Sequence, residues 1–551
     1  LVKKLGTSNF SKTDMDRFYA KKGVVRGAFS LQVVSENEVS KLLRSLNVQK
    51  STGCDNISAR FLKDGESVIT CPLTYIMNLS LKTSQVPQEF KIARVVPLYK
   101  KGCRNEEGNY RPVSILPVIS KILERIVYNQ VVSYMDKCDI IYGLQSGFRS
   151  NYSTDSAVSY MSDLVRLNMD KSKFTGMVVL DLQKAFDTVN HDILLAKLDS
   201  IGLSEETTIW FKSYLCGREQ FVEIDRSQSS LNHVTCGVPQ GSILGPLLFL
   251  IYVNDMETSI SSKCQLLLYA DDSVIVYSSD CVDEINKVLS EEMDKMYAWL
   301  TDNKLSLHLG KTEAILFGTN KKLQSVHDFN VKCQGKSLQV CHNMKYLGVI
   351  FDETLCGKSM ANSVLGKIGK GLKILHRKTQ YFNFEERKMV AMALLQSHFD
   401  YGCQMWYRGL TKYLKKKLQC AQNKMIRYII GADSRFHLSF EHFKKLNSLS
   451  VNNRVEYLTL TSMFNVHSKS APEYMIKLFS NTVHCHNTRF QRGYCLPCVK
   501  SSGHNSFCFN AVKMWNNLPF EIPSTKSMFK TKCKNYLLSV MKKEQDDIFV
   551  H

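Results

Sequence analysis

Two apolar stretches that carry aspartates at one end constrain the fold of this chain more than any other feature. MVVLDL, from Met177 to Leu182, has the continuous β-branched character of a buried strand, and Asp181 stands near its end. LLLYADDSVIVYSS places the acidic pair Asp271 and Asp272 between two apolar runs, which predicts a β-hairpin with charges at its tip. Carboxylates at the ends of buried strands are costly unless something positive lies beside them.

The chain as a whole is strongly basic. Its 551 residues include 72 Lys plus Arg and 51 Asp plus Glu, a formal net charge of +21, and 44% are hydrophobic. That composition is typical of a folded protein, and its positive excess favours a nucleic acid as partner before an anionic membrane. The longest apolar run, Ile243 to Val253, contains Gly245 and Pro246 and has about half the length of a membrane span, so we expect no membrane association.

The spacing of the 18 cysteines is not that of a disulfide-stabilised scaffold. They are scattered among apolar residues, as at Cys341 and Cys420, which predicts buried thiols in a reducing compartment. One group could be considered for zinc: His484, His486, Cys495, Cys498, His504 and Cys508. Pro497 inside the CxxC, the irregular spacing and the lack of a second CxxC argue against zinc.

The length predicts three or four domains. We interpret the first thirty or so residues as a loosely ordered entry segment, followed by a helix that Ser35 and Glu38 begin as a capping box. VPQEFKIARVVPLYKKG predicts a strand, and GNYRPVSILPVISKILERIV a loop before an amphipathic helix. KYLGVIFD, from Lys345 to Asp352, is expected to be one more strand, and beyond Glu353 the chain becomes helix-rich and basic.

Three aspartates brought together would repel one another unless divalent cations neutralised them. Carboxylate oxygens suit Mg²⁺ or Mn²⁺, and two such ions would form a clamp for phosphoryl transfer. The alternative, that each Asp merely ends a strand, would be preferred for YADD taken alone.

An ordered set of motifs decides between these alternatives. From Asn109 onward the chain shows NYRPVS, QSGFR, LDLQKAFDTVNH, GVPQGSILGP, YADD, WLTDNKLSLHLGKTEAILFG and KYLGVIFD. At these residues the sequence resembles a reverse transcriptase, specifically the polymerase of a non-LTR (LINE-like, jockey-like) retrotransposon. The resemblance is dense over residues 86–352 and continues more loosely to SFCFNAVKMWNNLP.

The resemblance implies an α+β right-hand polymerase. Residues 1–85 would lead into the fingers, residues 86–352 would form the fingers and a palm built on an antiparallel sheet, and residues 353–551 the helical thumb and a basic C-terminal region. In the helix predicted at YLKKKLQCAQNKMIRYI, Tyr413 and Tyr428 lie among Lys and Arg, which suggests a track for a template–primer backbone, with a solvated helix face as the alternative.

The resemblance also assigns the residues of a metal site. Asp181, Asp271 and Asp272 look like the catalytic aspartates that hold two Mg²⁺ ions, or Mn²⁺, with the Leu182 carbonyl as a further ligand. Lys311, in LGKTEAILFG, matches the lysine that would protonate the departing pyrophosphate. A plain lysine at a turn is the alternative for Lys311.

The same resemblance assigns the nucleotide-binding residues. Phe186 would be the aromatic gate that excludes a 2′-hydroxyl, or else an ordinary core aromatic. Gln240 and Gly241, in a glycine-rich loop, would approach the nascent base pair. Arg111 and Lys100 would contact the triphosphate, and Arg149 the template or nucleotide, unless these are solvated surface charges. Asp187, His191 and Asp192 would cap or begin the next helix rather than bind metal.

The implied function is RNA-directed DNA synthesis in the nucleus, with a cytoplasmic ribonucleoprotein stage. The partners would be an RNA template, a DNA primer at the nicked target, and dNTPs. Because the chain begins at Leu1 and not Met, we expect an upstream portion of the element to be missing. Another kind of reverse transcriptase (maturase-like or telomerase-like), an RNA-dependent RNA polymerase, against which Phe186 argues, and a catalytically inactive RNA-binding remnant remain as alternatives.

Overall fold

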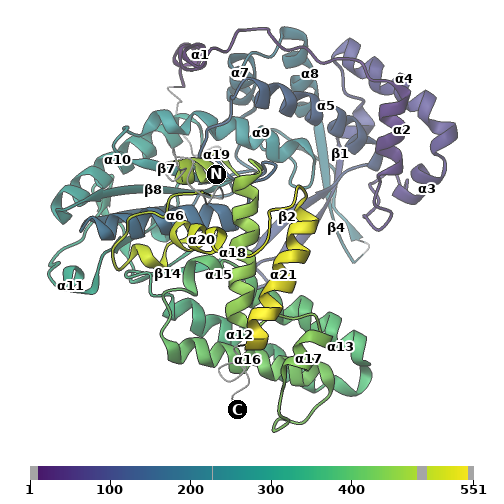
Figure 1. The fold of residues 1–551 in the computed structure, drawn as a ribbon. Helices are drawn as coiled ribbons and strands as arrows, with labels where there is room; N and C mark the ends of the chain where they lie inside the picture. Colours follow the sequence, from purple (N-terminus) through teal and green to yellow (C-terminus); the bar gives the residue numbers. More distant parts are fainter. Residues whose placement is uncertain (1–9, 226, 481–492, 544–551) are drawn as a thin grey trace. The chain divides into compact units, whose positions relative to one another are not determined.

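The computed structural model describes residues 10–225, 227–480 and 493–543, and its helices and strands are drawn in Figure 1. The fold combines helices with mixed sheets, which confirms the α+β class. The chain divides into two compact units whose segments alternate along the sequence. Unit 1 comprises Leu1–Phe148, Asp181–Ser262 and Glu292–Leu309, and unit 2 comprises Arg149–Leu180, Lys263–Glu291 and Gly310–His551. The division into 1–85, 86–352 and 353–551 stays a prediction.

Unit 1 is built on a five-stranded sheet in the order β2-β1-β4-β5, with β6 also paired to β4. Its strands are β1 Ile92–Tyr99, β2 Tyr110–Ile115, β4 Arg218–Ile224, β5 Ser227–Gln228 and β6 Asn232–Val234. Its helices are α1 Lys12–Lys21, α2 Glu36–Arg44, α3 Ala59–Asp64, α4 Glu66–Thr83, α5 Val118–Lys137, α7 His191–Ser200, α8 Glu205–Leu215 and α9 Leu244–Val253.

The strand β2 corrects one prediction, since its residues were expected to form a loop. It pairs antiparallel with β1, and Pro112 lies opposite Pro97. A proline cannot donate to a sheet ladder, but β2 is an edge strand, and β4 pairs only with Ile92–Val95 of β1, so neither proline interrupts a ladder on both sides.

The N-terminal segment corrects a second prediction. Residues Lys12–Lys21 form α1, with Ser11 as N-cap, instead of a loosely ordered stretch. Met15 and Tyr19, four residues apart, are both buried, and the Tyr19 hydroxyl accepts a hydrogen bond of 2.9 Å from Asn254 Nδ2. The capping box of Ser35 and Glu38 at α2 is confirmed.

The core helix of unit 1 is α9. Leu244 and the whole stretch from Leu247 to Val253 are buried, because every exposed turn of this helix would place large apolar side chains in water. Its N-terminus is covered by the buried carboxylate of Glu124 on α5, which accepts from the backbone N–H groups of Ile243 and Leu244.

Unit 2 contains a five-stranded sheet in the order β12-β9-β3-β8-β7. Its strands are β3 Phe174–Leu180, β7 Gln265–Tyr269, β8 Asp272–Ser279, β9 Glu313–Phe317 and β12 Gln339–Val340, beside the separate pairs β10 Lys332–Cys333 with β11 Lys336–Ser337 and β13 Asn343–Tyr346 with β14 Val349–Asp352. KYLGVIFD is therefore a hairpin and not the single predicted strand. Leu347 and Gly348 both have positive φ, as a tight two-residue turn requires.

The remainder of unit 2 is helical, as predicted beyond Glu353. Helix α10, Val282–Asp302, contributes its first part to unit 2 and its second to unit 1. The other helices are α6 Thr154–Asp170, α11 Asn320–Leu323, α12 Lys358–His376, α13 Phe384–Ala391, α14 Ser397–Asp400, α15 Cys403–Trp406, α16 Lys412–Ile430, α17 Phe440–Lys445, α18 Val451–His467, α19 Glu473–Ser480, α20 Phe507–Asn516 and α21 Lys526–Lys543.

Two carboxylates on α6 bind the backbone N–H groups of the first turn of α20 and of the segment before it. Asp163 accepts from the N–H groups of Phe507 and Cys508, at 2.6 and 2.7 Å, and Asp170 accepts from Lys500, Ser502 and Gly503. Burial raises the pKa of Asp163 to about 6, while these N–H donors and the charge of Arg166 act in the opposite direction.

The prediction of buried cysteines is wrong in part. Cys264, Cys333, Cys403, Cys508 and Cys533 are buried, but others, such as Cys71 and Cys498, are exposed, because a small side chain is also accommodated at the surface. No disulfide joins cysteines within the described ranges. No helix in those ranges combines the length and the apolar character that a membrane crossing requires.

Candidate active site

The acidic hairpin of unit 2 forms as predicted. β7 and β8 pair antiparallel up to Tyr269 opposite Asp272, which leaves Ala270 and Asp271 as the turn. Ala270 adopts φ 57°, the left-handed conformation that a two-residue hairpin needs. Asp271 and Asp272 are both exposed at this tip.

The pairing of β3 with β8 places the end of β3 beside the tip of the acidic hairpin. Leu180, the last residue of β3, lies opposite Ser273, which follows Asp272. Asp181 comes next in the chain, is half-buried and begins a segment of unit 1. The chain therefore continues to Asp181 from the end of the strand that pairs with the acidic hairpin.

Within unit 1, the backbone around Asp181 is paired with residues 306–308. The His308 N–H donates to the Asp181 carbonyl, and the Gln183 N–H donates to Ser306, both at 2.8 Å. These two bonds flank Leu182, which forms an isolated antiparallel bridge with Leu307. In such a pair the Leu182 carbonyl points away from residues 306–308, which suits its predicted role as a further ligand.

The negative charge of the acidic hairpin raises the pKa of two tyrosines in unit 2. Burial raises the pKa of Tyr346 and of Tyr269, and the negative charge of Asp272 raises both further. Asp271 forms no salt bridge within the described part of the chain. Exposed carboxylates of this kind are the oxygen donors that Mg²⁺ prefers.

A complete metal site is not assembled in the described ranges, since no group of three or more His, Cys, Asp or Glu side chains there could hold a metal ion. The metal-binding roles of Asp181, Leu182, Asp271 and Asp272 therefore stay predictions, supported by the chemistry of the donors and the position of the hairpin.

The glycine-rich loop of unit 1 is held against the segment that carries Phe186. The Gly237 N–H donates to Val189, and the Val238 N–H donates to the Phe186 carbonyl, at 2.7 and 2.9 Å. Gln240 contributes both its backbone and its side chain. Its carbonyl accepts from the Ser114 N–H on β2 at 2.7 Å, and its Nε2 donates to Asp187 Oδ1 at 2.8 Å.

These contacts form one wall of a cavity of about 280 Å³ that Asp187, Gln240, Ser114 and Pro112 line. Burial raises the pKa of Asp187, while the hydrogen bond from Gln240 and the charges of Lys184 and Arg111 lower it. The structure thus brings Gln240 and Asp187 together and places the positive charge of Arg111 near them.

Phe186 is half-buried and held by two other aromatic rings of unit 1. It stacks on Phe249 of α9 with ring centroids 4.4 Å apart, and Phe148 meets it edge-on at 6.2 Å. Such a ring has little freedom to move, which a steric gate requires; the gate assignment itself stays a prediction.

The positively charged residues predicted to contact the nucleotide or the template are divided between the two units. Lys100 and Arg111 are exposed at the same end of the β1–β2 hairpin, where the Lys100 N–H bonds the Asn109 carbonyl. Lys311 is exposed in a short 3₁₀ turn before β9 in unit 2. Arg149 lies over the Tyr152 ring at 4.2 Å. None of their functional roles is tested by these positions.

Of the two tyrosines predicted to lie on a nucleic-acid track along the basic helix α16, only Tyr413 is exposed. Tyr413 is 65% exposed on α16, but Tyr428 is only 2% exposed, because it lies on the face of α16 that packs into unit 2. Tyr428 is therefore unavailable to a nucleic acid. Of the zinc candidates, His484 and His486 lie outside the described residues, and within them Cys495 is half-buried, Cys498 exposed and Cys508 buried.

Asp187 is the main residue that the sequence did not assign to the site. It was expected to cap the next helix, but Asn190 is the N-cap of α7, and the Asp187 side chain is bound to Gln240. His191 does begin α7, and its Nε2 is 2.8 Å from the Gly237 carbonyl. A carboxylate one residue after an aromatic gate is the only sequence signal that could have pointed to Asp187.

Comparison with protein families identifies the central part of the chain. Residues 98–351 match the family described as reverse transcriptase (RNA-dependent DNA polymerase). The matched segment contains the acidic hairpin, the glycine-rich loop and Phe186.

The chain is also similar to several curated proteins. An RNA-directed DNA polymerase from the mobile element jockey of Drosophila funebris is 29% identical over 414 residues, which are 72% of this chain and 44% of the relative. A probable RNA-directed DNA polymerase from transposon BS of Drosophila melanogaster is 29% identical over 411 residues, 72% of this chain and 45% of the relative. The Pol polyprotein of a type-1 retrotransposable element R1 of Bradysia coprophila is 25% identical over 381 residues, 68% of this chain and 37% of the relative.

The chain spans less than half the length of these relatives. The similarity confirms the predicted resemblance to the reverse transcriptases of jockey-like and other non-LTR retrotransposons.

Proposed function

We propose that this chain is the RNA-directed DNA polymerase of a non-LTR retrotransposon, which adds dNTPs to a DNA primer on an RNA template. The observation that carries the proposal is the exposed Asp271–Asp272 hairpin within a segment that matches the reverse transcriptase family. The names of the jockey and BS relatives support it. The primer would be nicked target DNA, so the chain would act in the nucleus after a cytoplasmic ribonucleoprotein stage.

The proposal includes a right-hand arrangement. Residues 86–352 would supply fingers and palm, and residues 353–551 a thumb and a C-terminal region, with 1–85 leading into the fingers. The antiparallel pairing of β3, β8 and β7 supports the palm, and the basic helices α12 and α16 support the thumb.

The carboxylates of Asp181, Asp271 and Asp272, with the Leu182 carbonyl, would hold two Mg²⁺ ions. When bound, such ions activate the primer 3′-hydroxyl and stabilise the leaving pyrophosphate. Lys100 and Arg111 would bind triphosphate oxygens, and Lys311 would donate a proton to the pyrophosphate.

Selection of the nucleotide would fall to the loop and the gate in unit 1. Phe186, held between Phe249 and Phe148, would exclude a 2′-hydroxyl. Gln240 would contact the nascent base pair, with Asp187 orienting its amide and Gly241 allowing a close approach of the backbone.

Primer extension on an RNA template with dNTPs and Mg²⁺ tests the proposal. We expect DNA product from the chain, and a loss of at least about a hundredfold in the Asp271→Ala/Asp272→Ala variant, since removal of charge-stabilising groups typically costs this much. Asp283→Ala, which removes an exposed aspartate of the same unit, is the matched control and should keep full activity. RNA binding without DNA product under these conditions would instead favour the inactive remnant.

A further inference from the structure

Helix α4 of unit 1 presents an apolar stripe on its exposed face. Val68, Pro72, Tyr75 and Leu79 are all exposed, with exposed fractions of 77% for Val68, 69% for Tyr75 and 46% for Leu79. Their spacing of four, three and four residues places them on one face of a helix with 3.6 residues per turn. The seam of a coiled coil has the same spacing. We call these four residues the α4 stripe.

The opposite face of α4 is fixed within unit 1. Asn78 Oδ1 accepts from the Val34 N–H at 2.8 Å, and the Trp210 indole N–H donates to Ser80 Oγ at 3.1 Å. The residues of α4 that are buried are Thr70, Leu73, Thr74, Met77, Ser80 and Leu81. Rotating α4 to bury its stripe would break these contacts and expose the buried side chains. The α4 stripe therefore belongs to the surface of unit 1.

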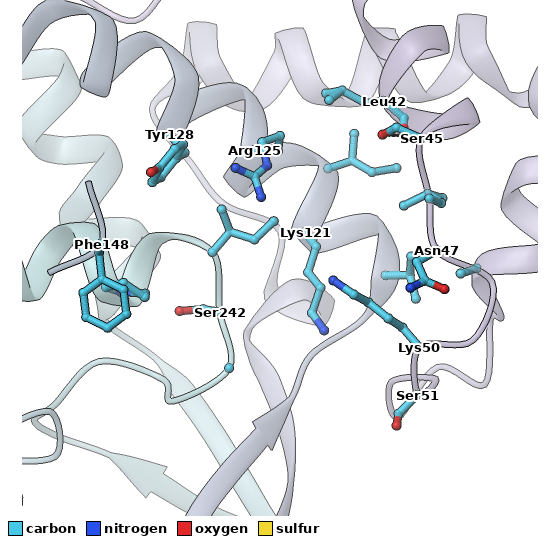
Figure 2. A pocket seen from close by; sticks show the side chains of 17 residues that line it. Leu42, Ser45, Asn47, Lys50, Ser51, Lys121, Arg125, Tyr128, Phe148 and Ser242 are labelled. Carbon is cyan, nitrogen blue, oxygen red and sulfur yellow. Dashed lines mark hydrogen bonds between the residues drawn. The ribbon is translucent and has the colours of Figure 1, made fainter. Parts of the chain in front are cut away.

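The α4 stripe is distinct from a cavity of about 470 Å³ in unit 1. Lys50 and Lys121 line that cavity, together with the end of α2, α5 and residues 241–246 (Figure 2). None of the described residues that line it comes from α4. The residues predicted to bind metal or nucleotide also lie outside α4. A partner on the α4 stripe is therefore recognised by the stripe itself.

The chemistry of α4 excludes a charged partner. Residues 67–81 contain no Asp, Glu, Lys or Arg, in a chain whose formal net charge is +21. A polyanion has no cation to bind on such a face, and helices that lie on membrane surfaces carry Lys and Arg beside their apolar side chains. The occupant that suits the α4 stripe is another uncharged apolar protein surface.

The exposed area of the stripe is enough for a weak protein–protein interface. With Ile76, which is 39% exposed beside it, the stripe presents roughly 400 Å² of mostly apolar surface, a size that is often functional. Two copies that cover each other's stripe would bury on the order of 1,000 Å² in total, including the rim of the contact. That is near the lower limit for a specific interface.

The α4 stripe is complementary to itself in one arrangement. In two antiparallel α4 helices related by a twofold axis, Val68 of each copy lies opposite Leu79 of the other, and Pro72 lies opposite Tyr75. Each pair joins a smaller side chain to a larger one, as close packing requires. In a parallel arrangement Tyr75 would instead meet Tyr75, and Pro72 would meet Pro72.

We propose that a second copy of this chain docks on the α4 stripe, with the two α4 helices antiparallel, to form a homodimer through unit 1. The small area predicts a dissociation constant on the order of micromolar. The dimer does not require the polymerase function proposed above, so a chain that makes DNA but stays monomeric would contradict the dimer alone. A dimer that makes no DNA would contradict the polymerase alone.

Sedimentation equilibrium of the nuclease-treated chain tests the dimer. We expect reversible association to twice the mass of the chain. Leu79→Glu, which places a charge in the contact twice, should weaken it at least tenfold. Leu231→Glu is the matched control, because Leu231 is 54% exposed in the same unit but lies outside α4, and it should leave the association unchanged. Since both leucines are exposed, neither variant should unfold at a lower temperature than the unchanged chain.

Two results of this experiment would overturn the proposal. One is a chain that stays monomeric up to about 100 μM, which would leave the α4 stripe to a different protein. The other is an equal weakening by Leu79→Glu and Leu231→Glu, which would show association that does not use the stripe.

The antiparallel register is tested by charges at positions 68 and 79. Within one copy these positions are about 16 Å apart along the helix, too far to pair with each other. Val68→Lys and Leu79→Glu should each weaken the dimer. Val68→Lys/Leu79→Glu places Lys opposite Glu twice and should associate about tenfold more tightly than either single variant. A double variant that associates no better than the single variants would contradict the proposed pairing.

Salt distinguishes the dimer from two copies bridged by RNA. The net charge of +21 makes two copies repel each other, and salt screens that repulsion. We therefore expect the dimer to persist between about 0.1 M and 1 M salt, whereas bridging by RNA weakens steeply with salt. Association that is lost at high salt or after nuclease treatment would overturn the proposal.

Discussion

Gly241 is the position in the glycine-rich loop where the backbone leaves no room for a side chain. It adopts φ 127°, and a Cβ would meet the Ser114 carbonyl oxygen well inside van der Waals contact. We expect Gly241→Ala to cost about 1–3 kcal/mol of unfolding free energy through strain and to lower primer extension about a hundredfold by displacing Gln240. Thermal unfolding and primer extension measure the two effects.

Gly143→Ala is the control for this prediction, because nothing lies within 4 Å of an added Cβ at Gly143 and its φ is not positive. If Gly241→Ala behaves like Gly143→Ala in both measurements, the loop does not depend on this close approach.

The Phe186 ring is held by Phe249 and Phe148, so shortening it should open space without moving its neighbours. We expect Phe186→Val to raise the incorporation of ribonucleotides relative to deoxyribonucleotides by about tenfold or more, as removal of a steric contact typically does. Competition between the two nucleotide types in primer extension measures the ratio. Phe61→Val, at a 69% exposed phenylalanine of unit 1, should leave the ratio unchanged, and equal ratios in both variants would contradict the gate.

At the scale of elements, α6 connects the sheet of unit 2 to α20 through Asp163. The pKa of this carboxyl is raised to about 6, mainly by burial, so the folded state binds its proton more tightly than the unfolded chain. The contribution of Asp163 to stability is therefore present below pH 4 and is lost as the pH rises through 6. By linkage, the loss amounts to about 3 kcal/mol.

Asp163→Asn should remove this dependence, because the amide is neutral at every pH and keeps one acceptor for the backbone N–H groups. We expect the unfolding free energy of the unchanged chain to fall relative to that of the variant by about 3 kcal/mol between pH 4 and pH 7. Denaturant unfolding at several pH values measures the difference. Asp283→Asn should show no such trend, and a constant difference for Asp163→Asn would refute the argument.

Some helices and strands could be predicted from the local sequence pattern alone, and others could not. The acidic hairpin, β3 and the basic helices α12 and α16 formed as predicted, because alternating or periodic apolar residues identify such elements without distant contacts. β2 was missed because Pro112 indicates a loop unless the strand is known to lie at a sheet edge. The β13–β14 hairpin was missed because only the positive φ values of Leu347 and Gly348 divide KYLGVIFD in two.

At the scale of the whole molecule, the net charge of +21 is the property that governs binding of a polyanion. The exposed lysines on the two basic helices that pack together in unit 2 include Lys367, Lys370, Lys373, Lys412, Lys416 and Lys417. If these contact phosphates, the slope of log affinity against log salt for single-stranded RNA should be about −4, at about 0.7 for each contact.

Anisotropy titrations from low to high salt give this slope. Lys416→Gln/Lys417→Gln should make it shallower by about 1.4, as expected for two phosphate contacts. An affinity independent of salt would contradict an electrostatic mode of RNA binding.

The sequence by itself determined the chemistry of this protein: which strands end in carboxylates, where the glycine-rich loop lies, and which family the motifs resemble. Those features depend on residues near one another in the chain. Only the tertiary structure decided that Gln240 binds Asp187, 53 residues away, that Phe186 is held between Phe148 and Phe249, and that Lys50 and Lys121 line the same cavity. Such contacts depend on how separate helices and strands pack, and packing is decided by the burial of distant side chains against one another rather than by local pattern.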